Sequence, residues 1–341
     1  MTTSTPVLPS PSPDAPARTP NLDEIDEIVE MPTARRLRWQ RVLTGLIVFG
    51  PLVAAVWAVV VALGGHMVSW TTLAVAAAFY VVTILGVTVG FHRLFTHRAF
   101  EARRPLKIVL AVAGSMSFQG SIIGWVAMHR RHHMFSDKAG DPHSPVWPEH
   151  HPLGKTRGFL HAHIGWLFKH QDTPRMRFAP DLLADRDLVW VDRMFLPLCI
   201  ATLALPFGIG YLLTGTIGGA LAVLLWAGVI RIGFGHQITW CTNSVCHMFG
   251  KQPFRSGDSS TNFAPLALLS MGESWHNAHH AFPSLARHGV DRHQVDVSAM
   301  VIRGFEKAGW VSRVRWPDAA RLDGRRLDGR RLDGRRLDAT R

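Results

Sequence analysis

Three histidine clusters are the residues of this 341-residue chain best suited to chemistry. They read His92-Arg-Leu-Phe-Thr-His97, His129-Arg-Arg-His132-His133 and His276-Asn-Ala-His279-His280, and each lies beside an apolar stretch. Neutral imidazole is the commonest metal ligand in proteins, and one tetrahedral site cannot use all of these side chains. The clusters therefore predict a centre that holds more than one metal ion.

The spacing within each cluster indicates how its histidines point. In the second and third clusters the histidines stand at i, i+3 and i+4, which places all three on one face of a helix. His92 and His97 are five residues apart, or about 140° around an ideal α-helix, so we expect a helix end or a bend there. Asn243 and His247 stand at i and i+4 near the end of a later apolar stretch and are candidates for the same site.

The donor set favours iron over zinc. Zinc is satisfied by three or four ligands and does no redox chemistry, whereas two iron ions, each with a position open for oxygen, use the whole set. Soluble di-iron proteins hold their metals largely with glutamate and histidine from bundle helices, so the scarcity of carboxylates in these clusters sets them apart. We expect Glu273, Asp137 and Asp141 to orient the imidazoles by accepting hydrogen bonds from the ring nitrogens that do not bind metal.

Two long uncharged stretches predict that a membrane positions the clusters. No Asp, Glu, Lys or Arg occurs between Arg41 and His92, or between Arg193 and Arg231. Each stretch has room for two spans of roughly 20 residues. By the positive-inside rule, the basic flanks place both termini and the histidine clusters in the cytoplasm. The expected spans are residues 43–63, 73–91, 195–213 and 217–234.

Residues 108–128 are also uncharged and almost long enough for another span. A crossing there would put the first two clusters on opposite membrane faces, where they cannot share a metal centre. The stretch from Gly114 to Ser121 is polar and glycine-rich, which suits hydrocarbon poorly. We therefore expect a helix, or a bent pair of helices, at the interface or buried beneath a cytoplasmic cap.

The chain divides into three parts. Residues 1–34, rich in proline and then in carboxylates, are expected to be disordered, as are residues 317–341, which repeat the pentapeptide Arg-Leu-Asp-Gly-Arg. Residues 35–316 are expected to form an all-α membrane domain with four transmembrane helices. Residues 92–193 and 236–316 would form its helical cytoplasmic cap, which holds the metal centre. No cleavable signal peptide is evident.

Composition narrows the classes of function. The formal net charge of +12 comes from basic residues that flank apolar spans and meet anionic lipid, so nucleic-acid binding is not expected. The three cysteines lie in or beside apolar segments and are expected to be reduced thiols. We expect the other histidines, among them His143, His161, His163 and His236, to be surface residues or supports for the ligands.

In the order and spacing of these motifs the chain resembles bacterial members of the integral-membrane fatty-acid desaturases, of the stearoyl-CoA (delta-9) type. That family carries an HXXXXH box followed by two HXXHH boxes. The resemblance covers roughly residues 40–300. Further matching segments are Gly90-Phe-His-Arg-Leu-Phe-Thr-His-Arg98, Asp141-Pro-His143, His163-Ile-Gly-Trp166, Asn243-Ser-Val-Cys-His247 and Gly272-Glu-Ser-Trp-His-Asn-Ala-His-His-Ala-Phe-Pro283.

The resemblance implies a mushroom-like enzyme of unsaturated fatty acid biosynthesis in the bacterial plasma membrane. Such enzymes use two iron ions, O2 and two external electrons to make a cis double bond, usually at the ninth carbon of a long acyl chain. The implied metal ligands are His92, His97, His129, His132, His133, His247, His276, His279 and His280, with Asn243 near one metal through water. Trp125, Thr239 and Trp240 match residues beside the kinked substrate tunnel. Nothing in the chain resembles a haem, flavin or ferredoxin domain, so a separate flavin or iron–sulfur reductase is the implied partner.

Two alternatives concern the acyl carrier and the reaction. Residues that bind the CoA head group in animal relatives correspond to about Gly120 and Ala127, and a basic pair is reduced to Lys169. Long-chain acyl-CoA is therefore the expected substrate, with acyl chains in membrane lipid as the alternative. A histidine-box alkane or lipid hydroxylase would use the same irons, but the matched Asn243 and His247 favour desaturation. A metal transporter would place its ligands midway through the spans instead of at their ends.

Overall fold

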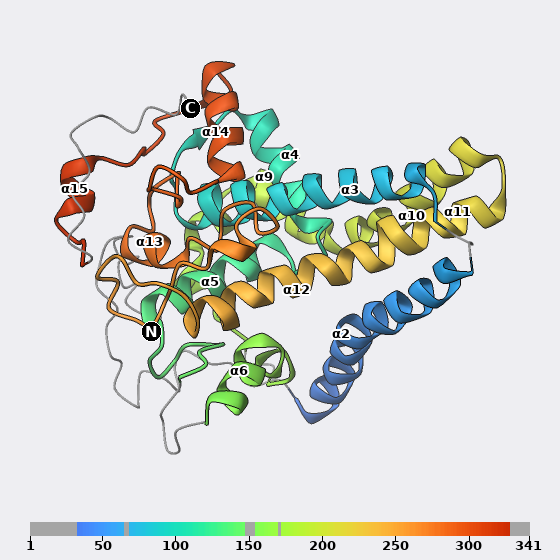
Figure 1. Cartoon of the computed structure of the whole chain (residues 1–341), viewed down its shortest axis with the longest axis horizontal. Helices are drawn as coiled ribbons and strands as arrows, with labels where there is room; N and C mark the ends of the chain where they lie inside the picture. Colours follow the sequence, from blue (N-terminus) through green and yellow to red (C-terminus); the bar gives the residue numbers. More distant parts are fainter. Residues whose placement is uncertain (1–32, 65–67, 147–153, 170–171, 328–341) are drawn as a thin grey trace, which may run out of the picture.

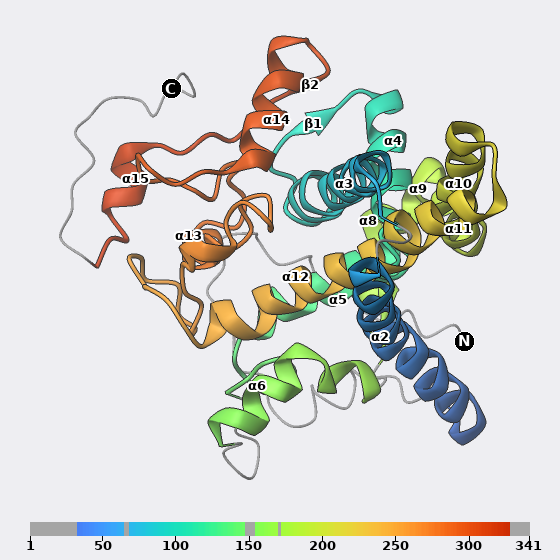
Figure 2. The same ribbon diagram turned by 45° about the vertical axis from the view of Figure 1, so that its right-hand side comes forward.

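The computed structural model describes residues 33–64, 68–146, 154–169 and 172–327, and nearly all of its regular structure is helical. Long helices extend to one side of the molecule and converge on a group of shorter helices and loops, which we call the cap (Figures 1 and 2). Within these residues the one sheet is an antiparallel pair in the cap, formed by β1 (Glu101–Ala102) and β2 (Val311–Ser312). The fold is therefore of the all-α class that the sequence predicts.

Within the described residues, four helices are long and apolar enough to cross a membrane. Exposed apolar side chains such as Trp70 and Leu212, at 88% and 84%, cover their outer surface. Water disfavours so large an apolar surface, whereas lipid does not. The helices are α2 (Ala34–Leu63), α3 (Trp70–Leu85) continued by η1 (Gly86–Thr96), α10 (Phe195–Thr214), and the continuous run of α11 (Ile217–Val223), η3 (Leu224–Ile230), α12 (Arg231–Ser244) and η4 (Val245–His247).

The stretch at residues 108–128 forms a bent pair of helices, α4 (Arg104–Ser115) and α5 (Ile122–Phe135). At 1.5 Å per residue each is roughly 20 Å long, short of the hydrocarbon thickness of about 30 Å. Helix α4 packs against η1 at glycines: a Cβ built on Gly86 would lie 2.2 Å from the backbone nitrogen of Gly114. This backbone contact holds the pair of helices close beneath the first histidine cluster.

The second membrane helix takes π-helical geometry where it reaches the first cluster. In η1 the N–H of His97 donates to the carbonyl of His92 at 3.1 Å, an i to i+5 bond. Residues five apart therefore become neighbours, and the two imidazole ring centroids lie 4.8 Å apart. The helix ends at Thr96, so the helix end or bend expected from the five-residue spacing is present. Such π segments occur mostly at functional sites.

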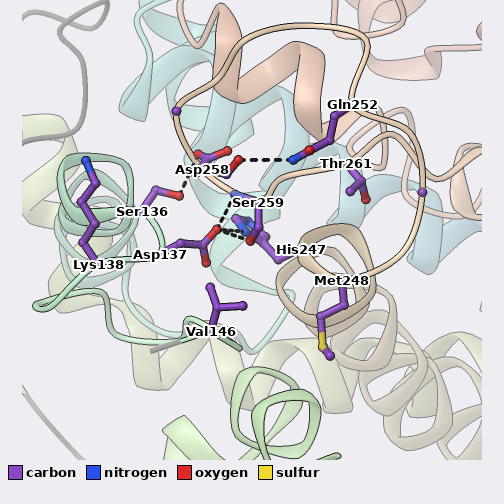
Figure 3. A pocket seen from close by; sticks show the side chains of 12 residues that line it. Ser136, Asp137, Lys138, Val146, His247, Met248, Gln252, Asp258, Ser259 and Thr261 are labelled. Carbon is purple, nitrogen blue, oxygen red and sulfur yellow. Dashed lines mark hydrogen bonds and ion pairs between the residues drawn. The ribbon is translucent and has the colours of Figure 1, made fainter. Parts of the chain in front are cut away.

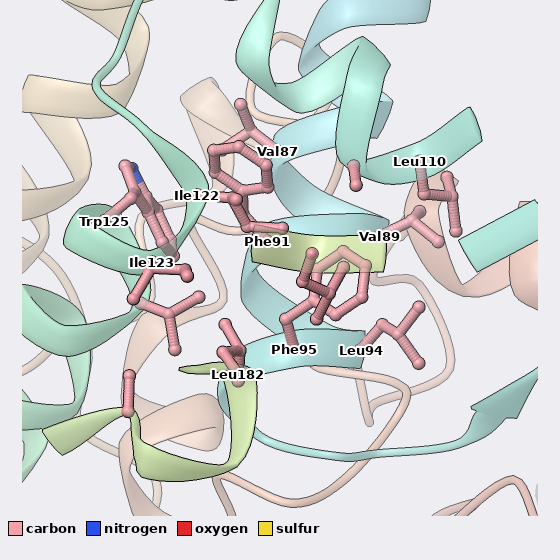
Figure 4. Close-up of a cluster of buried hydrophobic side chains, with 14 of the residues drawn as sticks. Val87, Val89, Phe91, Leu94, Phe95, Leu110, Ile122, Ile123, Trp125 and Leu182 are labelled. Carbon is pink, nitrogen blue, oxygen red and sulfur yellow. The ribbon is translucent and has the colours of Figure 1, made fainter. Parts of the chain in front are cut away.

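An apolar core joins the first cluster to the second. Side chains from η1, α4 and α5 interdigitate, and the rings of Phe91 and Trp125 lie 5.6 Å apart (Figure 4). Phe91, Ile122 and Ile123 are all less than 2% exposed. Burial of each such side chain contributes roughly 1.5–3 kcal/mol. The core therefore fixes His92 relative to the histidines of α5.

Shorter elements complete the cap. The expectation that the tail is disordered from residue 317 is wrong for its first part, which is folded and has Leu322 fully buried against the cap. The composition of the repeat gives no continuous apolar face, but one buried leucine is enough to anchor this part of the tail. Residues 1–32 and 328–341 lie outside the described residues. The remaining cap elements are α6 (Lys155–His163), η2 (Gly165–Phe168), α7 (Arg175–Phe178), α8 (Pro180–Ala184), α9 (Arg186–Arg193), η5 (Ala264–Leu266), α13 (His276–Ala281), α14 (Val297–Lys307) and α15 (Ala319–Asp323).

Candidate metal centre

The structure gathers the nine candidate histidines into two adjacent sets. Within each set the donor nitrogens lie within 4.8 Å of one another. We call them set 1 and set 2. Set 1 contains His92, His97, His129, His133 and His279, and set 2 contains His132, His247, His276 and His280.

The second and third clusters each contribute to both sets. On α5, His129 and His133 belong to set 1, whereas His132 belongs to set 2. On α13, His279 belongs to set 1, whereas His276 and His280 belong to set 2. The ring centroids of His133 and His280, one from each set, are 4.5 Å apart. The two sets are therefore parts of a single centre.

The Nε2 atoms within a set face one another at ligand-like distances. In set 1 the Nε2 of His279 lies 3.0 Å from that of His92 and 2.9 Å from that of His133. In set 2 the Nε2 atoms of His247 and His276 are 3.1 Å apart. Two nitrogens bound at a right angle to one metal ion, each at about 2.1 Å, would be about 3.0 Å apart. The spacing therefore fits nitrogens that share an ion.

Carboxylates contact the Nδ1 atoms of four of these imidazoles, on the side of each ring away from Nε2. Three of the four carboxylates were expected from the sequence. The Nδ1–H of His92 donates to Glu273 at 2.6 Å, that of His132 to Asp141 at 3.0 Å, and that of His247 to Asp137 at 3.1 Å. A proton held on Nδ1 leaves the Nε2 lone pair free to face the set. All three carboxylates that the sequence suggested thus contact candidate ligand histidines.

Sequence reasoning missed a fourth carboxylate, Asp258. Its Oδ2 lies 2.6 Å from the Nδ1 of His280. Burial raises the pKa of this carboxyl, but the adjacent His280 and further hydrogen bonds lower it more, so that it lies far below its usual range. Asp258 belongs to an irregular loop between η4 and η5, and no spacing rule links that loop to the third cluster.

A buried network behind His92 also escaped the sequence analysis. The guanidinium of Arg93 is fully buried and forms ion pairs with Glu273 and Asp296, each at 3.0 Å. His288 contacts the other oxygen of Glu273 at 3.3 Å. Burial lowers the pKa of His288 to about 4, which keeps it neutral. Arg93 therefore holds Glu273 in place, although from the sequence it reads only as a positive residue at the membrane face.

Five of the nine imidazoles are held in the neutral form that binds metal. Burial, reinforced by repulsion between neighbouring imidazoles, lowers the pKa values of five of them well below the ordinary range. The Nε2 of His97 is buried and has no hydrogen-bond partner among the described residues. Buried polar atoms are rarely left unpaired, so the donor sets fit a pair of bound cations. The five histidines are His97, His129, His133, His276 and His279.

A narrow cavity of about 230 Å³ leads to set 1. The three tunnel candidates, Trp125, Thr239 and Trp240, all line it, together with His129. Asn243 also lines this cavity. Much of the rest of the wall is aromatic or aliphatic, which suits an alkyl chain.

A larger pocket of about 680 Å³ opens beside set 2 (Figure 3). Asp137, Asp258 and His247 line it, so two of the three carboxylates that contact histidines of set 2 face this pocket. Burial raises the pKa of Asp137, but His247 and two hydrogen bonds from Ser259 bring it below the usual range. Set 2 is therefore reached from the cap surface through polar groups, whereas set 1 is reached through an apolar cavity.

A model of the fatty acid desaturase family matches residues 69–302, a region that contains all nine histidines. The chain belongs to the fatty acid desaturase family. This desaturase is therefore an oxidoreductase and, with its four candidate spans, an integral membrane protein. The match confirms the resemblance inferred from the histidine boxes.

Curated relatives cover most of the chain. The hex-5-enoyl-[acyl-carrier protein] acetylenase of Moorena producens (strain JHB) is 36% identical over 263 residues, which cover 76% of this chain and 82% of the relative. The sn-1 stearoyl-lipid 9-desaturase of Anabaena variabilis is 36% identical over 255 residues (73% and 86%). The acyl-CoA C20 Delta5-desaturase of Anemone leveillei is 33% identical over 254 residues (73% and 75%). The names of these relatives specify three different acyl carriers.

Proposed function

We propose that this desaturase introduces a cis double bond at the ninth carbon of a long-chain saturated acyl-CoA, using two iron ions, O2 and two electrons from a separate reductase. The observation that carries the proposal is the apolar cavity that reaches His129, a member of set 1. An alkyl chain in this cavity would bring its methylenes against the metal centre. Few other substrates need an apolar channel that ends on a ring of imidazoles.

The residues of each set would hold one iron. Set 1 offers five imidazole nitrogens and set 2 offers four, and Asn243 would approach one ion through a water molecule. The bound irons supply the oxidising power that removes two hydrogens from neighbouring methylenes. Glu273, Asp137, Asp141 and Asp258 would keep the Nδ1 protons in place, so that the Nε2 atoms stay available to the metals.

The cavity wall would select the carbon that reacts. An alkyl chain has no polar group along its length, so its position depends on shape and on the anchoring of its head group. The indole of Trp125 stacks on the imidazole of His129 with ring centroids 5.0 Å apart. The amide of Gln119 donates to the hydroxyl of Thr239 at 3.0 Å and ties the two sides of the wall together. These contacts would hold the cavity wall in a fixed shape beside the metal centre.

The electron route would start from the polar pocket beside set 2. A flavin or iron–sulfur reductase docked over that pocket would face His247 and its carboxylate partner. The ends of the second and fourth candidate spans both reach the centre, so both ends must lie on one membrane face. The basic residues beside the spans support the cytoplasm of a bacterial plasma membrane as that face. A basic surface there would attract an acidic electron carrier.

Acyl chains already in membrane lipid are the second candidate substrate. The cavity is lined by Thr44, Ile47 and Val48 of α2, which is itself a candidate span. A chain could therefore enter from the bilayer side. The sn-1 stearoyl-lipid 9-desaturase of Anabaena variabilis is a relative whose name specifies such a substrate.

The decisive experiment expresses the chain with a compatible reductase and follows labelled stearate. Isotope-labelled stearoyl-CoA and labelled stearoyl phospholipid are supplied separately to membranes, and the products are identified by mass spectrometry. Monounsaturated product from the CoA ester supports the proposal, and product from the phospholipid alone moves the assignment to the lipid. Hydroxylated product without any alkene would reject desaturation. His276→Ala should abolish product, whereas the exposed His293→Ala should not.

Metal analysis tests the cofactor separately. Purified protein should contain about two irons per chain if both sets are filled. One zinc ion and no iron would reject the di-iron assignment.

A further inference from the structure

The first Arg-Leu-Asp-Gly-Arg copy, residues 321–325, packs behind the helix that carries the third histidine cluster. Leu322 is 0% exposed and lies in one cluster with Phe254, Ala278 and Phe282. Leu327, the equivalent residue of the next copy, is 54% exposed. The side chains of two leucines with the same local sequence therefore have opposite environments, and only the first is buried in the protein.

The leucine lies on the side of α13 opposite the metal ligands. At about 100° per residue, His276, His279 and His280 share one face of this helix. Ala278 and Ala281, which belong to the cluster around Leu322, occupy the other face. A helix of six residues is too short to be stable alone, so its position depends on what packs behind it.

Arginines and backbone bonds of the tail fasten the same helix. Arg325 donates from Nη1 to the carbonyl of Ala281, the last residue of α13, at 2.5 Å. The N–H of Arg255 donates to the carbonyl of Arg325 at 2.9 Å. Arg326 forms an ion pair with Asp291. The tail is thus tied both to α13 and to the segment around residue 254.

That segment is itself bonded to the third cluster. The side chain of Asn277, between two of the histidines, accepts from the N–H of Phe254 at 2.8 Å and donates to the carbonyl of Phe254 at 3.0 Å. The N–H of Leu327 donates to the carbonyl of Pro253 at 2.8 Å. Segment 253–255 therefore lies between the tail and α13 and bonds to both.

We propose that the first repeat copy is a clasp that positions α13, and with it the histidines of the third cluster, for metal binding. The proposal rests on the assignment of those histidines as metal ligands. Leu322 and Arg325 are its positioning residues, and the ion pair of Arg326 with Asp291 holds the residue that follows the copy.

The test compares the two leucines in the full chain. We expect Leu322→Ser to speed amide hydrogen exchange of residues 276–282 by at least about tenfold in the metal-free protein. Leu327→Ser, the matched control, should leave this exchange unchanged, and Leu322→Met should keep it slow. Exchange of helix α3 reports whether each variant is folded.

Iron retention gives the second readout. Leu322→Ser should release iron to a chelator at least about tenfold faster than Leu327→Ser. Equal exchange and equal iron release in the two variants would overturn the clasp. If the parent chain binds no iron, the metal assignment fails while the exchange measurement still decides the clasp.

Discussion

Replacing Asp258 by asparagine isolates the effect of one carboxylate on one metal ion. The change keeps the shape of the side chain and removes its charge. Asp258 accepts the Nδ1–H of His280 at 2.6 Å and also accepts from Ser136 at 2.9 Å. A hydrogen bond to a charged group contributes about 1.5–3 kcal/mol, and one between neutral groups about 0.5–1.5 kcal/mol. The loss at the His280 bond alone is therefore about 1–1.5 kcal/mol, because the amide oxygen still accepts there.

This loss predicts a weakening of iron binding by about tenfold, since about 1.4 kcal/mol corresponds to a factor of ten. A tenfold weakening lies at the lower end of the roughly 10–100-fold losses of metal affinity that follow when a group hydrogen-bonded to a metal-bound histidine is changed. Because His280 belongs to set 2, the weakening should affect one of the two ions. Glu273→Gln should weaken the other, because Glu273 holds His92 of set 1.

The assay is equilibrium competition with a chelator, followed by counting of iron per chain. Asp172→Asn is the control, since Asp172 forms an exposed ion pair with Arg36 at the start of α2. We expect the Asp258 variant to lose one ion at chelator concentrations where the parent keeps two. Unchanged affinity would refute the role of Asp258. Simultaneous loss of both ions would refute the division into two sets.

Three further predictions follow from packing, charge and cavity shape. Gly86→Ala should lower the free energy of unfolding by about 1–3 kcal/mol, because the new Cβ would meet the backbone of α4. Thermal unfolding in detergent measures this loss. Gly45→Ala is the control and should show no such loss, because no atom lies within 4 Å of its Cβ. Asp181 has a pKa lowered to about 2, because hydrogen bonds from Arg130 outweigh the opposing effect of burial. Asp181→Asn should therefore cost roughly 1–2 kcal/mol near neutral pH after allowance for partial exposure, and the two proteins should converge as the pH falls from about 4 to 2. A difference that persisted at pH 2 would contradict that assignment. Thr239→Val keeps the side-chain shape but loses the hydrogen bond from the Gln119 amide. The double bond should then form at several carbon positions of the product. Mass spectrometry of product derivatives would show these positions.

The sequence by itself determined the chemistry and the membrane character of this protein. The i, i+3, i+4 spacing of the second and third clusters dictates one helix face each, because that rule is local and needs no partner. Uncharged stretches of sufficient length predict membrane helices for the same reason. Even the exclusion of residues 108–128 as a span followed from the sequence, since the clusters must share one membrane face.

Only the tertiary structure decided how these residues are combined. The division of His132 and His133 between two sets depends on where α13 and η4 approach α5, and no local rule encodes such distant contacts. The π-helical turn at His92 requires the close packing of η1 on α4 at their glycines. Asp258 reaches His280 through an irregular loop, whose path is set by packing and not by periodicity. Leu322 looks like any other residue of a polar repeat until the hydrophobic site behind α13 is formed, because a binding site for one side chain exists only in the folded protein.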